Sequence, residues 1–499
     1  MTTERKATGP QTPVVPINDG LFYGGAWHAP LAAEYLNITE PGSGRFLGRA
    51  AIAGAADADR AVAAAKAGFA VWRDTAPLER ARIMKGVAAK LRLHADELAL
   101  LDAADCGNPV KEMAADVMTA AALFDYFAGL VTEMKGSSIP MGSNAVNFSV
   151  REPLGVVVRI VAFNHPFLFA AGKMAAPLAA GNAVIIKPPE QAPLSAIRLA
   201  ELIGDMLPPG VISILPGGRE VGEALVGHRD VAMIGLVGSV QTGRAVMKLA
   251  AERIKPVLLE LGGKNALIAY PDVDVDEAAT AIVAGMNFTW CGQSCGSTSR
   301  AFVHADIYEQ VIERVRQQCA NYVPGLPTDY ATSMGAIISR AQHERVMAFI
   351  ASAKQDGARL VHGGKVPDNP ALAQGFYIEP TVFADVSTDM RIASEEIFGP
   401  VLSILKWSDE EDLLRDVNGV DYGLTCAIWT NDLEKAHRMA QRVQAGFVWI
   451  NEVGRHFLGA PFGGVKQSGI GREECLAELL SFTSEKNIHV SLRRVAAKR

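Results

Sequence analysis

Short apolar runs without polar alternation are the most regular feature of the chain between residues 155 and 263. They read GVVVRIVAF, NAVIIK, VISILPG, AMIGLVG and PVLLELGG. Stretches with helical spacing of apolar residues, such as 167–180 and 193–206, separate these runs. Strands that are apolar on both sides and alternate with helices are typical of a parallel sheet covered on both faces. The pattern therefore predicts a doubly wound α/β unit.

A second alternation of the same kind follows residue 265. The expected strands cover 265–270, 299–304, 399–406, 426–430 and 447–451. A helix is expected at 307–322 between the second and third of these strands. Ahead of the first unit, residues 51–70 and 78–120 are rich in good helix formers and predict a helical layer. The predicted fold class is therefore α/β, with two doubly wound parallel-sheet domains.

A polar segment at 136–152 and an alternating tail at 484–494 interrupt this pattern. The first predicts a hairpin or arm, and the second predicts an edge strand that pairs with the arm of another subunit. We expect a homo-oligomer, a dimer or a tetramer, built through this small third part. The expected boundaries are 1–135 with 155–261 for the first unit, 262–480 for the second, and 136–154 with 481–499 for the arm and tail.

Composition limits the class of protein. Hydrophobic residues make up 49% of the 499 residues, which is enough for full hydrophobic cores. Lys and Arg number 48 against 54 Asp and Glu, and a net charge of −6 argues against a large interface with nucleic acid or an anionic membrane. The N-terminal segment lacks the apolar core of a secretory signal, and no apolar run approaches the roughly 20 residues of a membrane helix. Six scattered cysteines favour the reducing cytoplasm.

Several polar or glycine positions come directly after the predicted strands of the first unit. They are Asn164, Lys187, Gly217, Gly238 and Glu260. Ligands of doubly wound sheets bind beyond the carboxyl ends of the strands. We therefore expect these positions to gather around one binding site.

Cys295 lies in the segment NFTWCGQSCGSTSR, where Gly292 and small neighbours leave backbone amides free to face a bound atom. Two interpretations are open from this residue alone: a nucleophile, or a buried thiol that only fills space. A covalent thiol mechanism also needs a base and a donor to the oxyanion. Glu260 and Asn164 are residue types that supply these two functions.

Seven motifs occur in one order along nearly the whole chain: FNHP, IIKPPEQAP, GLVGSVQTG, LELGGKN, GQSCGS, EEIFGPV and PFGGVKQSGIGRE. With them the chain resembles the non-acylating, NAD(P)-dependent aldehyde dehydrogenase superfamily. The resemblance implies that Cys295 is the nucleophile, Glu260 the general base and Asn164 the amide donor to the oxyanion. Lys173 matches a lysine that is common in the family and joins the catalytic candidates, with a solvated helical lysine as the alternative.

The resemblance also implies where a dinucleotide binds. It makes 1–135 with 155–261 the NAD-binding, Rossmann-like domain and 262–480 the catalytic domain. The turn GSVQTG at 238–243 stands in place of the G-x-G-x-x-G fingerprint and offers free N–H groups to a pyrophosphate. The matching cofactor positions are Phe163, Lys187, Glu190, Gly222, Gly238, Ser239, Leu261, Glu396 and Phe398. A carboxylate at Glu190 repels a ribose phosphate, so NAD is favoured over NADP.

Five positions are candidates for the wall of the substrate tunnel: His165, Gly172, Trp290, Arg455 and Phe462. Many relatives have a bulky aromatic residue at the position of Gly172, so glycine there predicts a widened pocket for ring-bearing or branched aldehydes. Arg455, with His456 beside it, is a candidate to bind the distal carboxylate of a semialdehyde. No metal site is expected.

The function expected from these residues is NAD-dependent oxidation of an aldehyde to a carboxylic acid through a cysteine thiohemiacetal and a thioester. Glu260 favours hydrolysis of that thioester by water. Three alternatives stay open: a coenzyme A-acylating aldehyde dehydrogenase, a cysteine hydrolase or esterase, and a catalytically silent binding protein. NADH formation from an aldehyde, with and without coenzyme A, separates them.

Overall fold

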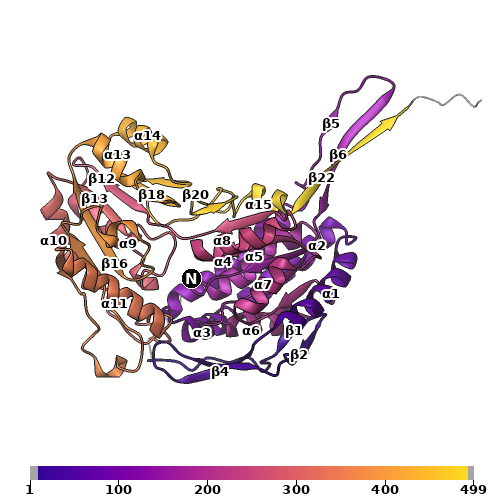
Figure 1. Ribbon diagram of the computed structural model, residues 1–499, viewed down its shortest axis with the longest axis horizontal. Helices are drawn as coiled ribbons and strands as arrows, with labels where there is room; N and C mark the ends of the chain where they lie inside the picture. The colour runs from indigo at the N-terminus through magenta and orange to yellow at the C-terminus, as the bar shows by residue number, and fades with distance from the viewer. Residues whose placement is uncertain (1–8, 493–499) are drawn as a thin grey trace, which may run out of the picture.

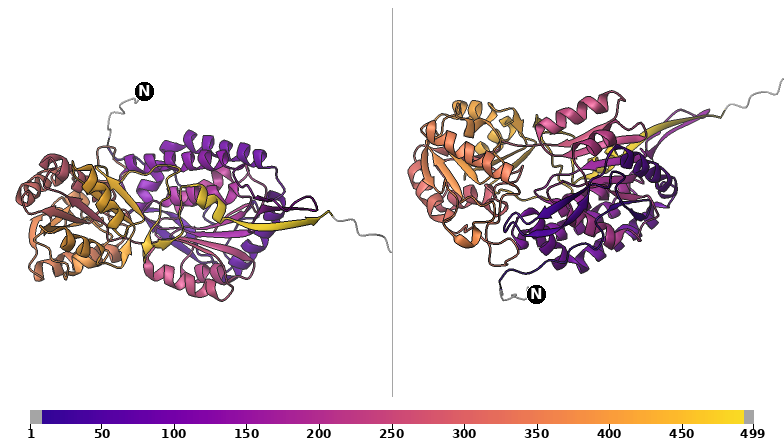
Figure 2. Two further views of the ribbon diagram at one scale, coloured as in Figure 1. Left: turned by 90° about the horizontal axis from the view of Figure 1, so that it is seen from above. Right: turned by 60° about the horizontal axis from the view of Figure 1, so that its bottom comes forward.

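The computed structural model describes residues 9–492, and the ends of the expected first unit and tail, 1–8 and 493–499, lie outside the described residues. Two α/β units lie side by side, and a narrow arm projects from the first of them (Figure 1). The arm points away from the second unit (Figure 2). The expected fold class is confirmed, because each unit is built on a sheet whose central strands are parallel.

The sheet of the first unit has eight strands in the order β2-β1-β9-β8-β7-β10-β11-β21. Its parallel strands are β7 (Val156–Ile160), β8 (Ala183–Lys187), β9 (Ile212–Ile214), β10 (Val231–Val237) and β11 (Val257–Glu260). The edge strands are antiparallel: β1 (Leu21–Tyr23), β2 (Ala26–His28) and β21 (Gly469–Ile470). The five parallel strands coincide with the five apolar runs of the sequence.

Helices cover both faces of this sheet, which explains why its strands show no alternation. On one face Val157 and Val184 pack with α5 (Pro166–Ala179) and α6 (Leu194–Ile203). The helical layer continues this core outward through α2 (Pro77–Leu93), α3 (Ala95–Cys106) and α4 (Val110–Gly129). On the other face Val158 and Ile185 pack with α1, α7 and α8. These helices cover Ala55–Trp72, Arg219–Gly227 and Val240–Ala251.

The sheet of the second unit has seven strands in the order β14-β15-β16-β13-β12-β18-β19. Their bounds are β12 (Ala266–Ala269), β13 (Arg300–His304), β14 (Arg359–His362), β15 (Thr381–Ala384), β16 (Val401–Trp407), β18 (Thr425–Trp429) and β19 (Phe447–Ile450). One face packs against α9 and α10, and the other against α11, α12, α13 and α14. These helices are α9 (Val275–Gly285), α10 (Tyr308–Cys319), α11 (Arg340–Gln355), α12 (Arg391–Ser394), α13 (Glu410–Asn418) and α14 (Leu433–Arg442).

The arm is a three-stranded sheet of β5 (Ser138–Ile139), β6 (Ala145–Pro153) and β22 (Thr483–Ser491). We expected the tail to pair with the arm of another subunit. Instead β22 pairs antiparallel with the arm of its own chain along the whole of β6, from Thr483 opposite Pro153 to Ser491 opposite Ala145. The arm of the same chain therefore pairs with one edge of the tail strand, and pairing of its other edge with another subunit stays a prediction.

The chain returns to the first unit before the tail. β21 adds the last strand to the first sheet beside β11, and α15 (Leu476–Ser481) packs against α5. We expected all of 262–480 to lie in the second unit. The end of this range, with β21 and α15, packs on the first unit instead. A two-residue strand carries no periodic signal that the sequence could display.

The remaining short elements are β3 (Tyr35–Thr39) with β4 (Phe46–Ala51), β17 (Tyr422–Gly423) with β20 (Val465–Lys466), and the 3₁₀ helices Phe288–Trp290 and Pro370–Leu372. Across residues 9–492, no helix combines the length and apolar character needed to cross a membrane. The same residues contain no group of His, Cys, Asp and Glu arranged to hold a metal ion.

Candidate active site

Cys295 lies on an irregular loop between the 3₁₀ helix Phe288–Trp290 and β13. Left-handed backbone at Asn287, Cys291 and Gly292 turns the chain sharply there. A Cβ at position 292 would lie 2.2 Å from the carbonyl oxygen of Gly399, so only glycine permits this close approach. The loop is thereby packed against the segment that leads into β16.

Asn265 holds this loop from the second sheet. Its side-chain amide donates to the carbonyl oxygens of Cys295 at 2.6 Å and Ser297 at 3.0 Å. Its Oδ1 accepts from the backbone N–H of Thr425 at 3.0 Å. Every polar atom of the buried Asn265 side chain is therefore used to fix the backbone around the thiol.

Glu260 ends β11 and is buried. Both of its carboxylate oxygens lack a hydrogen-bond partner among residues 9–492. A Cβ at position 463 would lie 2.7 Å from Oε1, so Gly463 leaves the space this carboxylate occupies. Burial, with the nearby charge of Glu473, raises the pKa of Glu260 well above its usual value. An unpartnered carboxylate with a raised pKa is suited to accept and return a proton.

Asn164 follows β7 and precedes the first turn of α5. Its side chain is buried, and its backbone carbonyl accepts a hydrogen bond from the side chain of Asn108 at 2.8 Å. That bond fixes the backbone from which the Asn164 amide projects. Asn164 and Cys295 line the same cavity.

Two cavities meet at the reactive residues. One, of about 270 Å³, lies at the carboxyl ends of β7, β10 and β11, and a larger one, of about 550 Å³, lies beneath α4 and α5. Val237, Glu260 and Cys295 line both. A thiol and a carboxylate at the junction of two cavities can contact two bound molecules at once.

The surroundings of Cys295 favour the protonated thiol. Burial, together with the charges of Glu260 and Glu396, raises its pKa to about 12. The thiolate is the nucleophilic form of a cysteine, so a reaction at this sulfur requires removal of the proton or nearby positive charge. Glu260 lines both cavities with Cys295 and is a carboxylate able to accept this proton once it is itself deprotonated.

Six of the nine expected cofactor positions line the smaller cavity: Phe163, Gly238, Ser239, Leu261, Glu396 and Phe398. The Phe163 and Phe398 rings meet edge to face with centroids 5.6 Å apart. Phe398 has left-handed backbone, and its carbonyl accepts from the Gln342 side chain at 2.8 Å.

Glu396 also has a fixed place in this cavity. Its Oε1 accepts from the backbone N–H of Gly263 at 3.0 Å, and burial raises its pKa to about 7. A Cβ at position 262 would lie 2.0 Å from Oε2. The glycine pair after β11 therefore forms a cradle for this carboxylate.

Ser239 is the N-cap of α8, and its side chain accepts from the backbone N–H of Thr242 at 3.1 Å. Gly238 precedes it at the end of β10. Gly238 and this N-cap line the smaller cavity, and the positive end of α8 favours an anion there.

The other three expected cofactor positions lie outside this cavity. Lys187 ends β8, and Glu190 follows it at an exposed position of the loop. Burial lowers the pKa of Lys187, and the negative charge of Glu190 partly offsets this shift. A Cβ at Gly218, the N-cap of α7, would lie 2.9 Å from Glu190 Oε2. Gly222 is on α7 with open space beside it. These three residues therefore lie near the carboxyl end of β8 and on α7, outside the smaller cavity.

Among the expected substrate positions, His165, Trp290 and Phe462 line the larger cavity. Gly172 is not part of its wall, because Leu123 and Leu168 cover this position: a Cβ there would lie 2.7 Å from Leu123 Cδ1.

The loop candidates differ from each other. The Arg455 side chain is 65% exposed and lies over the ring of Phe457, so it does not line the cavity. His456 does line it, with Nδ1 3.2 Å from a carboxylate oxygen of Glu474.

Lys173 is buried rather than solvated. Its Nζ donates to Oε2 of Glu473 at 2.5 Å, and Arg159 donates to the other oxygen. Both Lys173 and Glu473 line the larger cavity. This buried set of three is called the Glu473 network below.

The sequence analysis did not single out several of these residues. Glu473 and Asn265 are the last letters of PFGGVKQSGIGRE and LELGGKN, so the motifs contained them without indicating their contacts. Asn108 and Asp116 lie in or near a helical stretch whose composition gives no functional signal. Their contacts with Asn164 and His165 arise only when α4 packs on α5.

A known family model covers almost the whole chain. It is described as the aldehyde dehydrogenase family and matches residues 27–488. Aldehyde dehydrogenase tropH from Talaromyces stipitatus is 50% identical over 485 residues, which cover 96% of this chain and 94% of that protein.

Solved structures give the same result. The NAD+ complex of an aldehyde dehydrogenase from Bacillus cereus is 35% identical, with a TM-score of 0.92, over 95% of this chain and 96% of that one. A mutant of P. syringae AldA indole-3-acetaldehyde dehydrogenase, in complex with NAD+ and IAA, is 36% identical with a TM-score of 0.92, over 96% and 97% of the two chains. The sequence, the fold and the meeting of Cys295 and Glu260 at two cavities thus agree. The chain belongs to the aldehyde dehydrogenase family of oxidoreductases.

Proposed function

We propose that this protein oxidises an aldehyde to a carboxylic acid with NAD, through a thiohemiacetal and a thioester on Cys295. The observation that carries the proposal is the junction of the two cavities, where Cys295 and Glu260 face both. A dinucleotide in the smaller cavity and an aldehyde in the larger one would then meet at the sulfur.

The residues present fit a nicotinamide dinucleotide. The N-terminus of α8 offers N–H groups to a pyrophosphate, and Glu396, held by Gly263, offers a carboxylate to a ribose hydroxyl. Phe163 and Phe398 would flank the ring. When bound, NAD supplies the hydride acceptor. The exposed carboxylate of Glu190 supports a preference for NAD over NADP.

Cys295 carries out the first covalent step. Loss of the thiol proton gives a thiolate, which forms a bond to the aldehyde carbon while the carbonyl π electrons move to oxygen. The Asn164 side-chain amide and the Cys295 backbone N–H donate hydrogen bonds to that oxyanion. Loss of hydride from the same carbon leaves a thioester on Cys295.

Glu260 carries out the second step. Its carboxylate takes a proton from a water molecule as the water oxygen bonds to the thioester carbon. The resulting tetrahedral intermediate expels the Cys295 sulfur, which regains a proton, and the carboxylic acid leaves. The missing hydrogen-bond partners of Glu260 support this role, because neither oxygen has to give up a bond to another side chain before it accepts a proton.

The larger cavity supports a ring-bearing aldehyde. Its volume is about 550 Å³, and four large aromatic residues contribute to its wall: Phe169, Trp290, Trp449 and Phe462. This support comes from the cavity itself rather than from Gly172. One solved relative is an indole-3-acetaldehyde dehydrogenase captured with IAA, which also favours a substrate with a ring.

We further propose that the protein works in the cytoplasm as a homo-oligomer, a dimer or a tetramer. The six cysteines are free thiols, which fits a reducing compartment. The arm exposes the side chains of Val146 and Val490 on its projecting sheet, which is suited to a second copy of the chain.

One assay tests the function. We expect the native protein to form NADH from aromatic aldehydes, without a requirement for coenzyme A, and Cys295→Ala to form none. Release of the free acid, measured by chromatography, should match NADH mole for mole. A strict requirement for coenzyme A would indicate the acylating alternative, and ester cleavage without NAD would indicate a cysteine hydrolase.

A further inference from the structure

A charged pair lies in the wall of the larger cavity, away from the thiol. His165, at the N-cap of α5, has its Nδ1 2.8 Å from Oδ2 of Asp116 on α4. Both side chains line the cavity and both are largely buried, with 16% and 8% of their surfaces exposed. The catalytic steps proposed above do not use either residue.

Most of the wall around this pair is apolar or aromatic. The His165 ring lies 5.3 Å from the ring of Phe169 and 5.5 Å from that of Trp290, measured between centroids. On α4, Ala115, Met118 and Ala122 line the same wall. Burying a histidine and an aspartate among such residues costs free energy unless their polar atoms are used.

One polar atom of the pair is still available. Asp116 binds Nδ1 of His165, whereas Nε2 has no hydrogen-bond partner among residues 9–492. Nε2 is not fully enclosed by the surrounding residues, so it stays accessible. The ring belongs to a cavity-lining residue, and Nε2 is its only unused polar atom.

The surrounding charges favour the doubly protonated ring, which carries a hydrogen on Nε2. Burial disfavours the imidazolium, but Asp116, Asp102 and Glu112 together outweigh burial and raise the pKa of His165. With Asp116 bound to Nδ1, the protonated ring offers Nε2–H as a donor.

We propose that His165, held by Asp116, determines substrate specificity by donating a hydrogen bond from Nε2 to an acceptor oxygen on the ring of an aromatic aldehyde. The inference rests on the proposed function and deepens it from a ring-bearing aldehyde to an oxygen-substituted one. A hydroxyl, a phenolate and a carboxylate share this acceptor chemistry. A methyl group of similar size to a hydroxyl does not.

The test compares substrates that differ only in this group. kcat/KM is measured for the hydroxybenzaldehydes, the carboxybenzaldehydes and the methylbenzaldehydes, each at matching ring positions. We expect the native protein to prefer an oxygen-bearing ring over the methyl ring by about tenfold or more, the range of one hydrogen bond to a charged group. In His165→Phe this ratio should fall to about one.

Further variants separate hydrogen bonding from wall shape. His165→Gln retains a donor and should recover part of the ratio, and Asp116→Asn should lower it by removing the charge that holds the imidazolium. Thr119→Val is the matched control, because the Thr119 hydroxyl already donates to the Ala115 carbonyl at 2.9 Å. We expect the control to keep the native ratio.

Each outcome has a separate meaning. An unchanged ratio in His165→Phe, or an equal fall in Thr119→Val, overturns the inference while Cys295-dependent NADH formation still stands. A fall in His456→Phe in place of His165→Phe would move recognition to the cavity mouth and overturn it as well. If the native protein forms no NADH from any of these aldehydes, the proposed function itself fails.

Discussion

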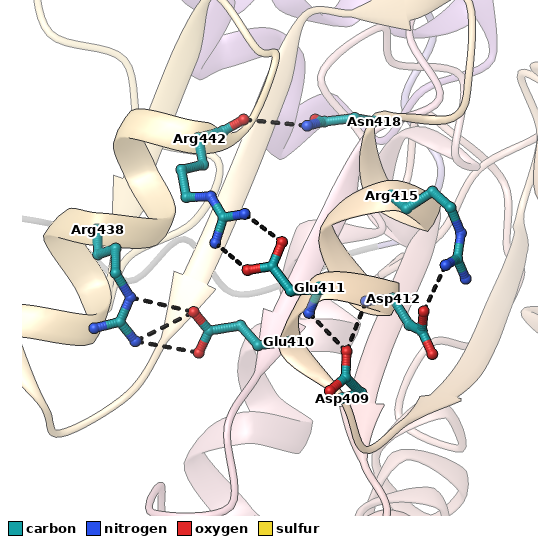
Figure 3. A network of polar contacts seen from close by, with 8 residues as sticks. All are labelled: Asp409, Glu410, Glu411, Asp412, Arg415, Asn418, Arg438 and Arg442. Atoms are coloured by element: carbon teal, nitrogen blue, oxygen red, sulfur yellow. Dashed lines mark hydrogen bonds and ion pairs between the residues drawn. The ribbon is translucent and has the colours of Figure 1, made fainter.

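Two glutamates of this molecule each bind an arginine, one inside the protein and one on its surface. Glu473 accepts from Arg159 on one oxygen and from Lys173 on the other, and all three side chains are buried. Glu411 on α13 accepts two bonds from Arg442 on α14, at 2.7 and 2.6 Å, and remains 72% exposed (Figure 3). The chemistry of the two pairs is alike, and their surroundings are opposite.

Exposure to solvent determines how much each ion pair contributes to the free energy of unfolding. Around Glu411, water can hydrate either charge when the other is removed, so the pair contributes little. Around Glu473 the side chains are almost fully buried, so water compensates little for a lost partner and a single substitution leaves buried charges nearly unpaired. The buried pair therefore fixes a geometry beside the reactive residues, whereas the exposed pair mainly joins two surface helices.

Glu260 adds a third case within the buried region. It has no cation of its own, and burial raises its pKa well above its usual value. Burial acts on Glu473 in the same direction, but the charges of Lys173 and Arg159 outweigh it and lower the pKa of Glu473. Two neighbouring carboxyl groups thus have opposite preferences for a proton: Glu473 favours the anion and Glu260 favours the protonated form.

The largest effect is expected for Glu473→Gln. The substitution keeps the shape of the side chain but leaves Arg159 and Lys173 buried without a counter-charge. We expect the free energy of unfolding to fall by about 3–5 kcal/mol, the range for breaking a buried ion pair. Urea unfolding followed by tryptophan fluorescence measures it. A loss as small as that of a surface pair would show that water reaches this network.

A smaller effect of opposite pH dependence is expected for Glu260→Gln. Because the folded pKa of Glu260 is raised, the folded chain holds its proton more tightly than the unfolded chain above the unfolded value of 4.5. This stabilisation is present at low pH and is lost as the pH rises through the folded pKa. The melting temperature of Glu260→Gln should therefore rise relative to that of the native protein as the pH increases from about 5 through the folded pKa of Glu260.

Glu473 supplies the reference for that measurement. Its lowered pKa gives stability that is present above the unfolded value of 4.5 and is lost as the pH falls through the folded pKa. The loss of melting temperature caused by Glu473→Gln should thus become smaller toward acid pH. The melting temperature of Glu260→Gln, relative to the native protein, should instead increase toward alkaline pH. Parallel pH profiles for the two variants would contradict the assignment of opposite protonation states.

The sheets were predictable because burial on both faces leaves a clear signature. β8 is a run of branched apolar residues that ends in Lys187, and the sequence marks both its extent and its carboxyl end. Parallel strands end at one edge of a sheet, so Asn164 and Glu260 could be expected near each other. Their roles, and that of Cys295, came from the resemblance and stay a prediction.

The finer parts of the site could not be predicted from the chain alone. Whether Gly172 opens a cavity depends on which neighbouring helix covers it, and Leu123 of α4 fills that space. The partner of His165 lies 49 positions away on another helix, where an aspartate looks like an ordinary surface residue. Lys173 resembled a solvated helical lysine because the fold, rather than local sequence, brings Glu473 to it.

The smallest effect is expected for Glu411→Gln, which makes at the surface the same change as Glu473→Gln makes in the interior. Arg442 can turn to water or to neighbouring acids such as Glu410, which already binds Arg438. We expect the melting temperature to change by about 1 °C or less, and the change to vanish at about 1 M salt, where exposed charges are screened. Differential scanning calorimetry at two salt concentrations measures this. A salt-independent loss that matches Glu473→Gln would mean that solvent exposure does not separate the two pairs, and the contrast between them would fail.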